Sequence, residues 1–298
     1  MDEKAGGAGV PGTVVITDSA SNIPQRLRDG LPLSVVPITL ILDGVDYGDD
    51  VDMSAAEFYA RQAADPDAQY STSCLSAGQA LAAYRAVAES ADGIVSVHTG
   101  SGLSGSFAAA CQAADLMASE GSIPIELVDT GTVSMACGFC VLAAARAARS
   151  GASVVEAAEA ARRTVDRVKM FVVVKTLRGV AQSGRVPSVV GYFLARIPIS
   201  PVLQIGNGGV KLVRPERTYS RSIAHLIKTL SREIGEDPVD LAVMHAAAPE
   251  EAVELGRLLS SRHQCRQVTI TEFTPAMGAH TGQGLLGAAF CPAELRTL

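Results

Sequence analysis

The sequence predicts an α/β protein with two domains. The N-terminal domain is expected to be a three-layer α/β domain with a parallel sheet, and the C-terminal domain an α+β domain with a mixed sheet. Two observations carry this prediction. In the first half, short runs rich in β-branched residues alternate with Ala-rich helical stretches, whereas the second half adds a hairpin pattern. The chain has 298 residues, and about 100–200 residues per domain is usual. We expect a flexible tail over 1–12 and domains over 13–165 and 166–298.

Strands and helices alternate through the first domain. Two helix starts, Ser54 with Glu57 and Ser76 with Gln79, fit the capping box, in which each side chain satisfies a backbone donor near the other residue. This alternation predicts a parallel sheet covered by helices on both faces. The expected strands are 14–17, 35–42, 93–98 and 123–128, and further helices are expected over 106–120 and 135–150.

The second domain mixes a hairpin with strand–helix alternation. Gly206-Asn-Gly-Gly209 separates two apolar runs and is typical of a hairpin turn. A buried strand is expected over 169–174, and a short helix should follow it. The remaining expected elements are hairpin strands within 202–213, helices over 221–233 and 249–262, and strands over 239–244 and 267–273.

Composition excludes several classes of protein. Hydrophobic residues make up 48% and charged residues 19%, which excludes intrinsic disorder. Apolar runs end well before the roughly 18–20 residues of a membrane span. A net charge of −6 argues against nucleic-acid binding. No signal-peptide pattern is present, and six cysteines are too few for a disulfide scaffold of this size. We therefore expect a cytoplasmic protein with reduced thiols.

A glycine motif offers one hypothesis of function. Gly100-Ser-Gly-Leu-Ser-Gly105 follows an expected strand and opens a helix, in the order of a dinucleotide fingerprint, and Asp129 lies where a ribose-binding acid would be. The motif is on a middle strand, however, and contains two serines. A helix start of this kind is also a general anion site, or a tight turn with Ser104 as N-cap. An NAD(P)-dependent oxidoreductase using Gly100–Gly105 therefore stays open as an alternative.

Three other polar segments each have a structural and a functional interpretation. Ser71-Thr-Ser-Cys-Leu-Ser76 is typical of a capping loop or could bind a ligand. His280 is expected in a Gly-rich loop after a strand, where it is either solvated or hydrogen-bonded to an acid. Arg185 is either a surface residue or an anion clamp.

Together these segments resemble the DegV family, from about residue 14 to 290. The matching motifs, in the family's order, are Thr17-Asp-Ser19, Val36-Pro-Ile38, Tyr47-Gly-Asp-Asp50, Thr72-Ser73, Ser101-Gly-Leu-Ser-Gly-Ser106, Val128-Asp-Thr130, Ser183-Gly-Arg-Val186 and His280-Thr-Gly-Gln-Gly284. The resemblance implies a FakB-like carrier. Such a protein binds a long-chain fatty acid at the junction of its domains and presents the carboxyl group to a partner fatty acid kinase (FakA-like), which makes acyl phosphate for phospholipid synthesis.

The resemblance also implies a binding site. Thr72, Ser104 and the backbone of Gly105 would contact the head group, with Arg185 and His280 close by. The family's threonine-serine motif continues Gln-Pro, whereas this chain has Cys74-Leu75. The hydroxyls are kept and the chemistry of the loop changes. Burying about fifteen methylenes at about 0.8 kcal/mol each would supply on the order of 12 kcal/mol before costs.

We expect a carrier without catalytic residues, metal or cofactor other than the bound fatty acid. The chain lacks a P-loop, and no Ser-His-Asp arrangement or metal cluster is evident. A hydrolase with Ser104 as nucleophile is a third hypothesis, although its glycine spacing misses the Gly-x-Ser-x-Gly pattern by one residue.

Three further features have a possible structural or functional role. Cys137 and Cys140 have thioredoxin-like spacing but lie inside an expected helix, which favours buried packing. His98 is a candidate supporting residue beside the Gly/Ser loop. A basic group is either a solvated surface or a docking face for the kinase or for transient contact with a membrane; it comprises Lys211, Arg214, Arg217 and Arg221.

Overall fold

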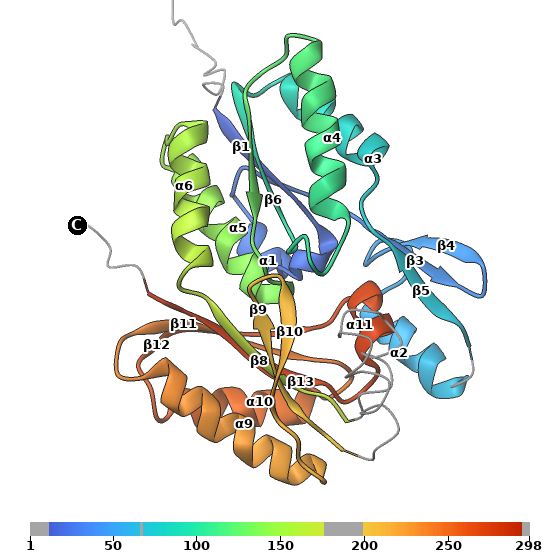
Figure 1. Cartoon of the computed structure of the whole chain (residues 1–298), viewed down its shortest axis with the longest axis vertical. Helices are drawn as coiled ribbons and strands as arrows, with labels where there is room; N and C mark the ends of the chain where they lie inside the picture. Colours follow the sequence, from blue (N-terminus) through green and yellow to red (C-terminus); the bar gives the residue numbers. More distant parts are fainter. Residues whose placement is uncertain (1–11, 66–67, 176–198, 294–298) are drawn as a thin grey trace, which may run out of the picture.

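The computed structural model describes residues 12–65, 68–175 and 199–293 (Figure 1). Its first sheet has four parallel strands in the order β2-β1-β6-β7, as the alternation predicts. Side chains alternate between the two faces, so Val15 and Ile16 of β1 enter different cores. The strands are β1 (Thr13–Asp18), β2 (Leu33–Val36), β6 (Gly93–His98) and β7 (Ile125–Asp129).

Helices cover both faces of this sheet. On one face α3 and α4 pack against it, and on the other α5 and α6 (Figure 1). Ser76 forms the predicted capping box with Gln79, and Ser153 forms a second one with Glu156. The helices are α3 (Ala77–Ala88), α4 (Ser106–Ser119), α5 (Ser134–Arg149) and α6 (Val154–Val165). The three-layer architecture of the first half is confirmed.

The expected strand over 35–42 is wrong in one respect, because it is two strands in two sheets. After β2, Pro37 lacks a backbone donor and interrupts the ladder. The chain then enters a small antiparallel sheet of order β4-β3-β5. Its strands are β3 (Thr39–Leu42), β4 (Val45–Gly48) and β5 (Tyr70–Ser73), and α2 (Ala55–Ala64) lies between β4 and β5 in sequence. Thr72 therefore lies on a strand and not in a capping loop.

A mixed six-stranded sheet forms the second half, in the order β10-β9-β8-β13-β11-β12. The predicted hairpin is present, with Asn207 and Gly208 at positive φ in its turn. Two helices, α9 (Tyr219–Ile234) and α10 (Pro249–Ser260), cover one face. The strands are β8 (Lys169–Val173), β9 (Val202–Gly206), β10 (Gly209–Arg214), β11 (Val239–His245), β12 (Cys265–Glu272) and β13 (Leu286–Pro292). The α+β class of this half is confirmed.

Two elements of the second half differ from expectation. Residues 275–281 form a helix, α11 (Pro275–Thr281), so the loop predicted around His280 is wrong. Gly278 permits this helix to pack closely, since an added Cβ would lie 2.6 Å from Tyr59 Oη. The other element is β13, a central strand that lies antiparallel to both β8 and β11. Its glycine and alanines gave no strand signal in the sequence.

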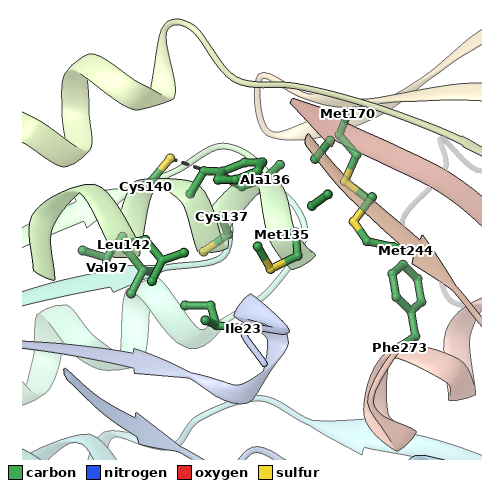
Figure 2. Packing of buried hydrophobic residues seen from close by; sticks show 14 of the residues in the cluster. Ile23, Val97, Met135, Ala136, Cys137, Cys140, Leu142, Met170, Met244 and Phe273 are labelled. Atoms are coloured by element: carbon green, nitrogen blue, oxygen red, sulfur yellow. Dashed lines mark hydrogen bonds between the residues drawn. The ribbon is translucent and has the colours of Figure 1, made fainter. Parts of the chain in front are cut away.

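The other face of the mixed sheet meets the first half. Figure 2 shows Met135 and Ala136 of α5 in one cluster with Met170, Met244 and Phe273 from the second half. The small sheet also contacts α11. The chain crosses from the first half to the second in the segment between the end of α6 at Val165 and the start of β8 at Lys169. The division into two domains near residue 165 stays a prediction.

The CxxC pair of α5 is buried in this core. Cys137 and Cys140 are free thiols, and burial raises the pKa of both. Cys140 Sγ donates to the carbonyl of Ala136 on the preceding turn (Figure 2). Thiolate formation is disfavoured in such surroundings, so the two cysteines act in packing.

Candidate functional site

A cavity lies between the two halves of the molecule. The space between the surrounding atoms, open solvent included, is about 880 Å³. Its walls are mainly apolar. On the side of the mixed sheet they come from β8, β9, β10 and the residue after β8, namely Met170, Val172, Val174, Leu203, Ile205 and Val210. Such a cavity suits a long apolar ligand.

Polar side chains from separate elements enter the wall of this cavity. Thr72 is on β5, Ser104 is in the loop before α4, and His280 is on α11. Thr72 Oγ1 and His280 Nε2 are 2.6 Å apart, within hydrogen-bond distance, although they are 208 residues apart in sequence. The structure thus brings together three of the five residues expected at the site.

Ser104 lies in a tight turn. The backbone N–H groups of Leu103 and Ser104 both donate to the carbonyl of Gly100. Ser104 Oγ donates to Ser106 Oγ at 3.2 Å and accepts from the Ser106 backbone N–H at 3.2 Å. The N-cap of α4 is Gly105 and not Ser104, a difference of one residue. A polar hydroxyl therefore lies at a helix N-terminus beside an apolar cavity.

The other expected residues have different outcomes. Gly105 is exposed and adjoins Cys74, since an added Cβ would lie 2.9 Å from Cys74 Sγ. Cys74 itself lines the cavity, and Leu75 is buried. Arg185 lies outside the described residues, as do Gly184-Arg-Val-Pro187 and the short helix expected before them.

The glycine motif has a packing explanation. A Cβ on Gly102 would lie 2.0 Å from the carbonyl oxygen of Gly208 in the β9–β10 turn, and one on Gly100 would lie 2.6 Å from Gly131. The Asp129 carboxylate accepts hydrogen bonds from the backbone N–H groups of Ser101 and Gly131. Gly100, Gly102 and Asp129, which suggested a dinucleotide site, therefore make packing contacts and hydrogen bonds between loops.

A buried Asp-His-Ser chain crosses the first sheet. His98 Nδ1 lies 3.1 Å from Asp18 Oδ2, and His98 Nε2 lies 2.7 Å from Ser96 Oγ. Ser96 in turn accepts from Tyr84 Oη at 2.7 Å, and burial raises the pKa of Tyr84 to about 12. This arrangement could not be predicted from the sequence, because Asp18 lies on a different strand from Ser96 and His98 and is 80 residues away from His98 in sequence. Ser96 is 0% exposed, so the chain satisfies buried polar groups and offers no accessible nucleophile.

The carboxyl group of Asp49 is also buried. It accepts from Ser19 Oγ at 2.6 Å and from the backbone N–H of Ala276 at 2.8 Å. Burial raises the pKa of Asp49, against the opposing effect of these hydrogen bonds. Asp49 thereby joins the start of α11 to the short 3-10 helix after β1, η1 (Ser19–Ser21).

Two surface properties bear on partners. Across residues 12–65, 68–175 and 199–293, no helix is long and apolar enough to span a membrane. In the basic group, Arg214 forms an ion pair with Glu216 at 3.3 Å. A docking role for this group stays a prediction.

Comparisons with known proteins agree with this architecture. A family model described as "Uncharacterised protein, DegV family" matches residues 13–293. A DegV domain-containing protein of Streptomyces coelicolor is 34% identical over 275 residues, which cover 92% of this chain and 96% of the relative. The crystal structure of DegV, a fatty acid binding protein from Bacillus subtilis, has a TM-score of 0.85 at 24% identity, covering 95% of this chain and 100% of that one.

A second structure, on the fatty acid binding of a DegV family protein from Thermus thermophilus, gives a TM-score of 0.84 at 24% identity. It covers 95% of this chain and 100% of that chain. At these identities the two structures establish the fold, and the family match spans nearly the whole sequence. With 34% identity to a DegV domain-containing protein in addition, this chain belongs to the DegV family.

Proposed function

We propose that the protein binds a long-chain fatty acid non-covalently and presents the carboxyl group to a partner fatty acid kinase. The acyl chain would lie in the cavity between the two sheets, and the carboxyl group beside Thr72, Ser104 and His280. The observation that carries the proposal is an apolar cavity whose polar side chains come together from three separate elements.

The apolar walls account for binding of the acyl chain. About fifteen methylenes transferred from water would supply on the order of 12 kcal/mol before the costs of immobilisation. The walls carry few aromatic side chains; Leu203, Ile205 and Val210 are examples of the aliphatic ones. Such surfaces offer dispersion contacts along a chain without polar groups that would need partners.

The polar groups account for binding of the carboxyl group. Burial of a carboxylate without partners is costly, whereas hydroxyl donors and an imidazole can satisfy its oxygens. Ser104 adds the N-terminus of α4, a helix of 14 residues, where negative charge is favoured. The backbone of Gly105 is proposed as a further contact. Arg185, proposed as a charge partner, lies outside the described residues.

The head-group end is close to the surface, as transfer to a partner requires. Gly105 is exposed, and so are Ser71 and Ser73, which flank Thr72 on β5. A kinase could approach the carboxyl group here and form acyl phosphate while the acyl chain stays buried. The fatty acid binding of the Bacillus subtilis and Thermus thermophilus proteins supports the ligand class. The kinase, acyl phosphate and phospholipid synthesis rest on the resemblance to FakB-like carriers.

Mass spectrometry of the freshly purified protein, native and after organic extraction, tests the ligand. We expect one fatty acid per chain, or uptake of added palmitate or oleate. An empty protein that takes up neither would contradict the proposal. A rise in melting temperature with NAD(P) would then favour an oxidoreductase, and labelling by a fluorophosphonate a serine hydrolase. Adding a fatty acid kinase and ATP to the loaded protein, and measuring acyl phosphate, tests the partner separately.

A further inference from the structure

Thr99 follows β6 directly and contributes to the wall of the cavity. The residue is 2% exposed, and its hydroxyl oxygen has no hydrogen-bond partner among the described residues. The backbone on either side of Thr99 is hydrogen-bonded. The backbone N–H of Gly100 donates to the carbonyl of Thr132, and Thr130 Oγ1 donates to the carbonyl of His98. The group at this position without a partner is therefore the Thr99 side chain.

A buried hydroxyl without a partner lowers stability, because it has lost hydrogen bonds to water and gained none. Most buried polar side chains in native structures are paired for this reason. Valine has nearly the shape of threonine and would line an apolar cavity without this loss. The hydroxyl thus has an explanation if a ligand in the cavity accepts its hydrogen bond.

We propose that Thr99 is a third hydroxyl of the head-group site and donates to an oxygen of the fatty acid's carboxyl group. The inference rests on the proposed function. A carboxylate has about four lone-pair sites on its two oxygens, and the hydroxyls of Thr72 and Ser104 would fill two of them. Thr99 lies five residues before Ser104 on the same chain segment, and both line the same cavity. One staggered rotation about χ1 redirects the hydroxyl without moving the backbone.

The chain supplies matched controls for this inference. Thr17 and Thr132 are also buried threonines whose hydroxyl oxygens have no partner among the described residues, but neither lines the cavity. Replacing any of the three by valine removes one unpaired hydroxyl and keeps the side-chain shape. Of the three substitutions, only Thr99→Val should then lower the affinity for the fatty acid.

The experiment measures palmitate affinity and the melting temperature of empty and loaded protein for the three valine variants and Thr99→Ser. We expect Thr99→Val to weaken binding about 5- to 50-fold, and Thr17→Val and Thr132→Val to stay within about twofold. Thr99→Ser should restore most of the affinity. The empty Thr99→Val variant should have a melting temperature no lower than that of the empty wild type. Saturating palmitate should raise the melting temperature of the wild type by more than it raises that of the variant.

Two results would overturn the role of Thr99. One is wild-type affinity in Thr99→Val, and the other is an equal loss in the two control variants. A wild-type protein that fails to bind palmitate or oleate would instead overturn the proposed function, and the two failures are therefore distinguishable.

Discussion

Ser104 illustrates how one side chain can combine a structural role with a proposed binding role. Its hydroxyl pairs with both the side chain and the backbone N–H of Ser106, which orders the first turn of α4. The same residue lines the cavity. A hydroxyl can accept two hydrogen bonds while donating one. To bind a carboxyl group, Ser104 would therefore only have to redirect its O–H from Ser106 Oγ to a carboxyl oxygen, and it could still accept from the Ser106 backbone N–H.

Ser104→Ala should weaken fatty acid binding by about 1–3 kcal/mol, because a carboxyl oxygen would be buried without its partner. Titration of the empty protein with a fluorescent or isotopically labelled fatty acid measures the loss. Urea unfolding of the same variant separates this loss from any weakening of α4. Unchanged affinity would remove Ser104 from the head-group site.

At the scale of elements, the β9–β10 hairpin connects the two sheets. Its strands form part of the cavity wall, and its turn rests on loops that follow β6 and β7. The backbone N–H of Gly208 donates to the carbonyl of Gly131 at 2.8 Å. Glycines are required at this contact because two backbones approach more closely than any Cβ would allow. The glycine motif of the sequence thus serves chain packing beside Ser104.

Gly102→Ala should destabilise the protein by about 1–3 kcal/mol, since its Cβ would lie 2.0 Å from the Gly208 oxygen and the hairpin must shift. Urea denaturation measures the change. Gly209→Ala is the matched control in the same hairpin. Gly209 has no atom within 4 Å of an added Cβ and no positive φ, so the substitution should be nearly neutral. Equal effects in both variants would show that the contact with Gly208 is not responsible.

At the scale of the whole molecule, buried polar side chains join the two halves next to the cavity. Asn22 Oδ1 accepts from the backbone N–H of Thr274, and Asn22 Nδ2 donates to the carbonyl of Glu272. Asp49 joins Ser19 to Ala276 in a similar way. Since these bonds are directional, they fix how α11, which carries His280, lies against the first half.

The unfolding free energy should depend on pH through Asp49. Burial raises its pKa in the folded protein, so above about pH 4, the usual range for Asp, the unfolded state binds fewer protons than the folded state. Stability is then fully present below the unfolded pKa and is lost as pH rises through the folded pKa. Asp49→Asn should flatten this slope in urea unfolding above about pH 4.

Asp46→Asn is the charge-matched control, because Asp46 is exposed on the neighbouring strand β4. It should leave the slope unchanged. A slope in Asp49→Asn equal to that of the wild type would assign the pH dependence to another group.

Local sequence patterns predicted most elements of the two larger sheets. These patterns are local, because each involves only a few consecutive residues, and they can be recognised without knowing the fold. Examples are the apolar runs of β1, β6, β8 and β11 and the capping box of α3. The splitting of 35–42, the strand β13 and the helix α11 could not be predicted in the same way. Their residues are placed by neighbours from distant parts of the chain, as Gly278 is by Tyr59.

The candidate site divides similarly. The sequence by itself determined the class of each half and, through the DegV resemblance, the candidates Thr72, Ser104 and His280. Only the tertiary structure brought Thr72 and His280 to 2.6 Å, assigned Gly102 to packing and left the Thr99 hydroxyl without a partner beside a cavity. The physical reason is that strand and helix periodicity are local properties, whereas contact between side chains depends on packing of elements that can be two hundred residues apart.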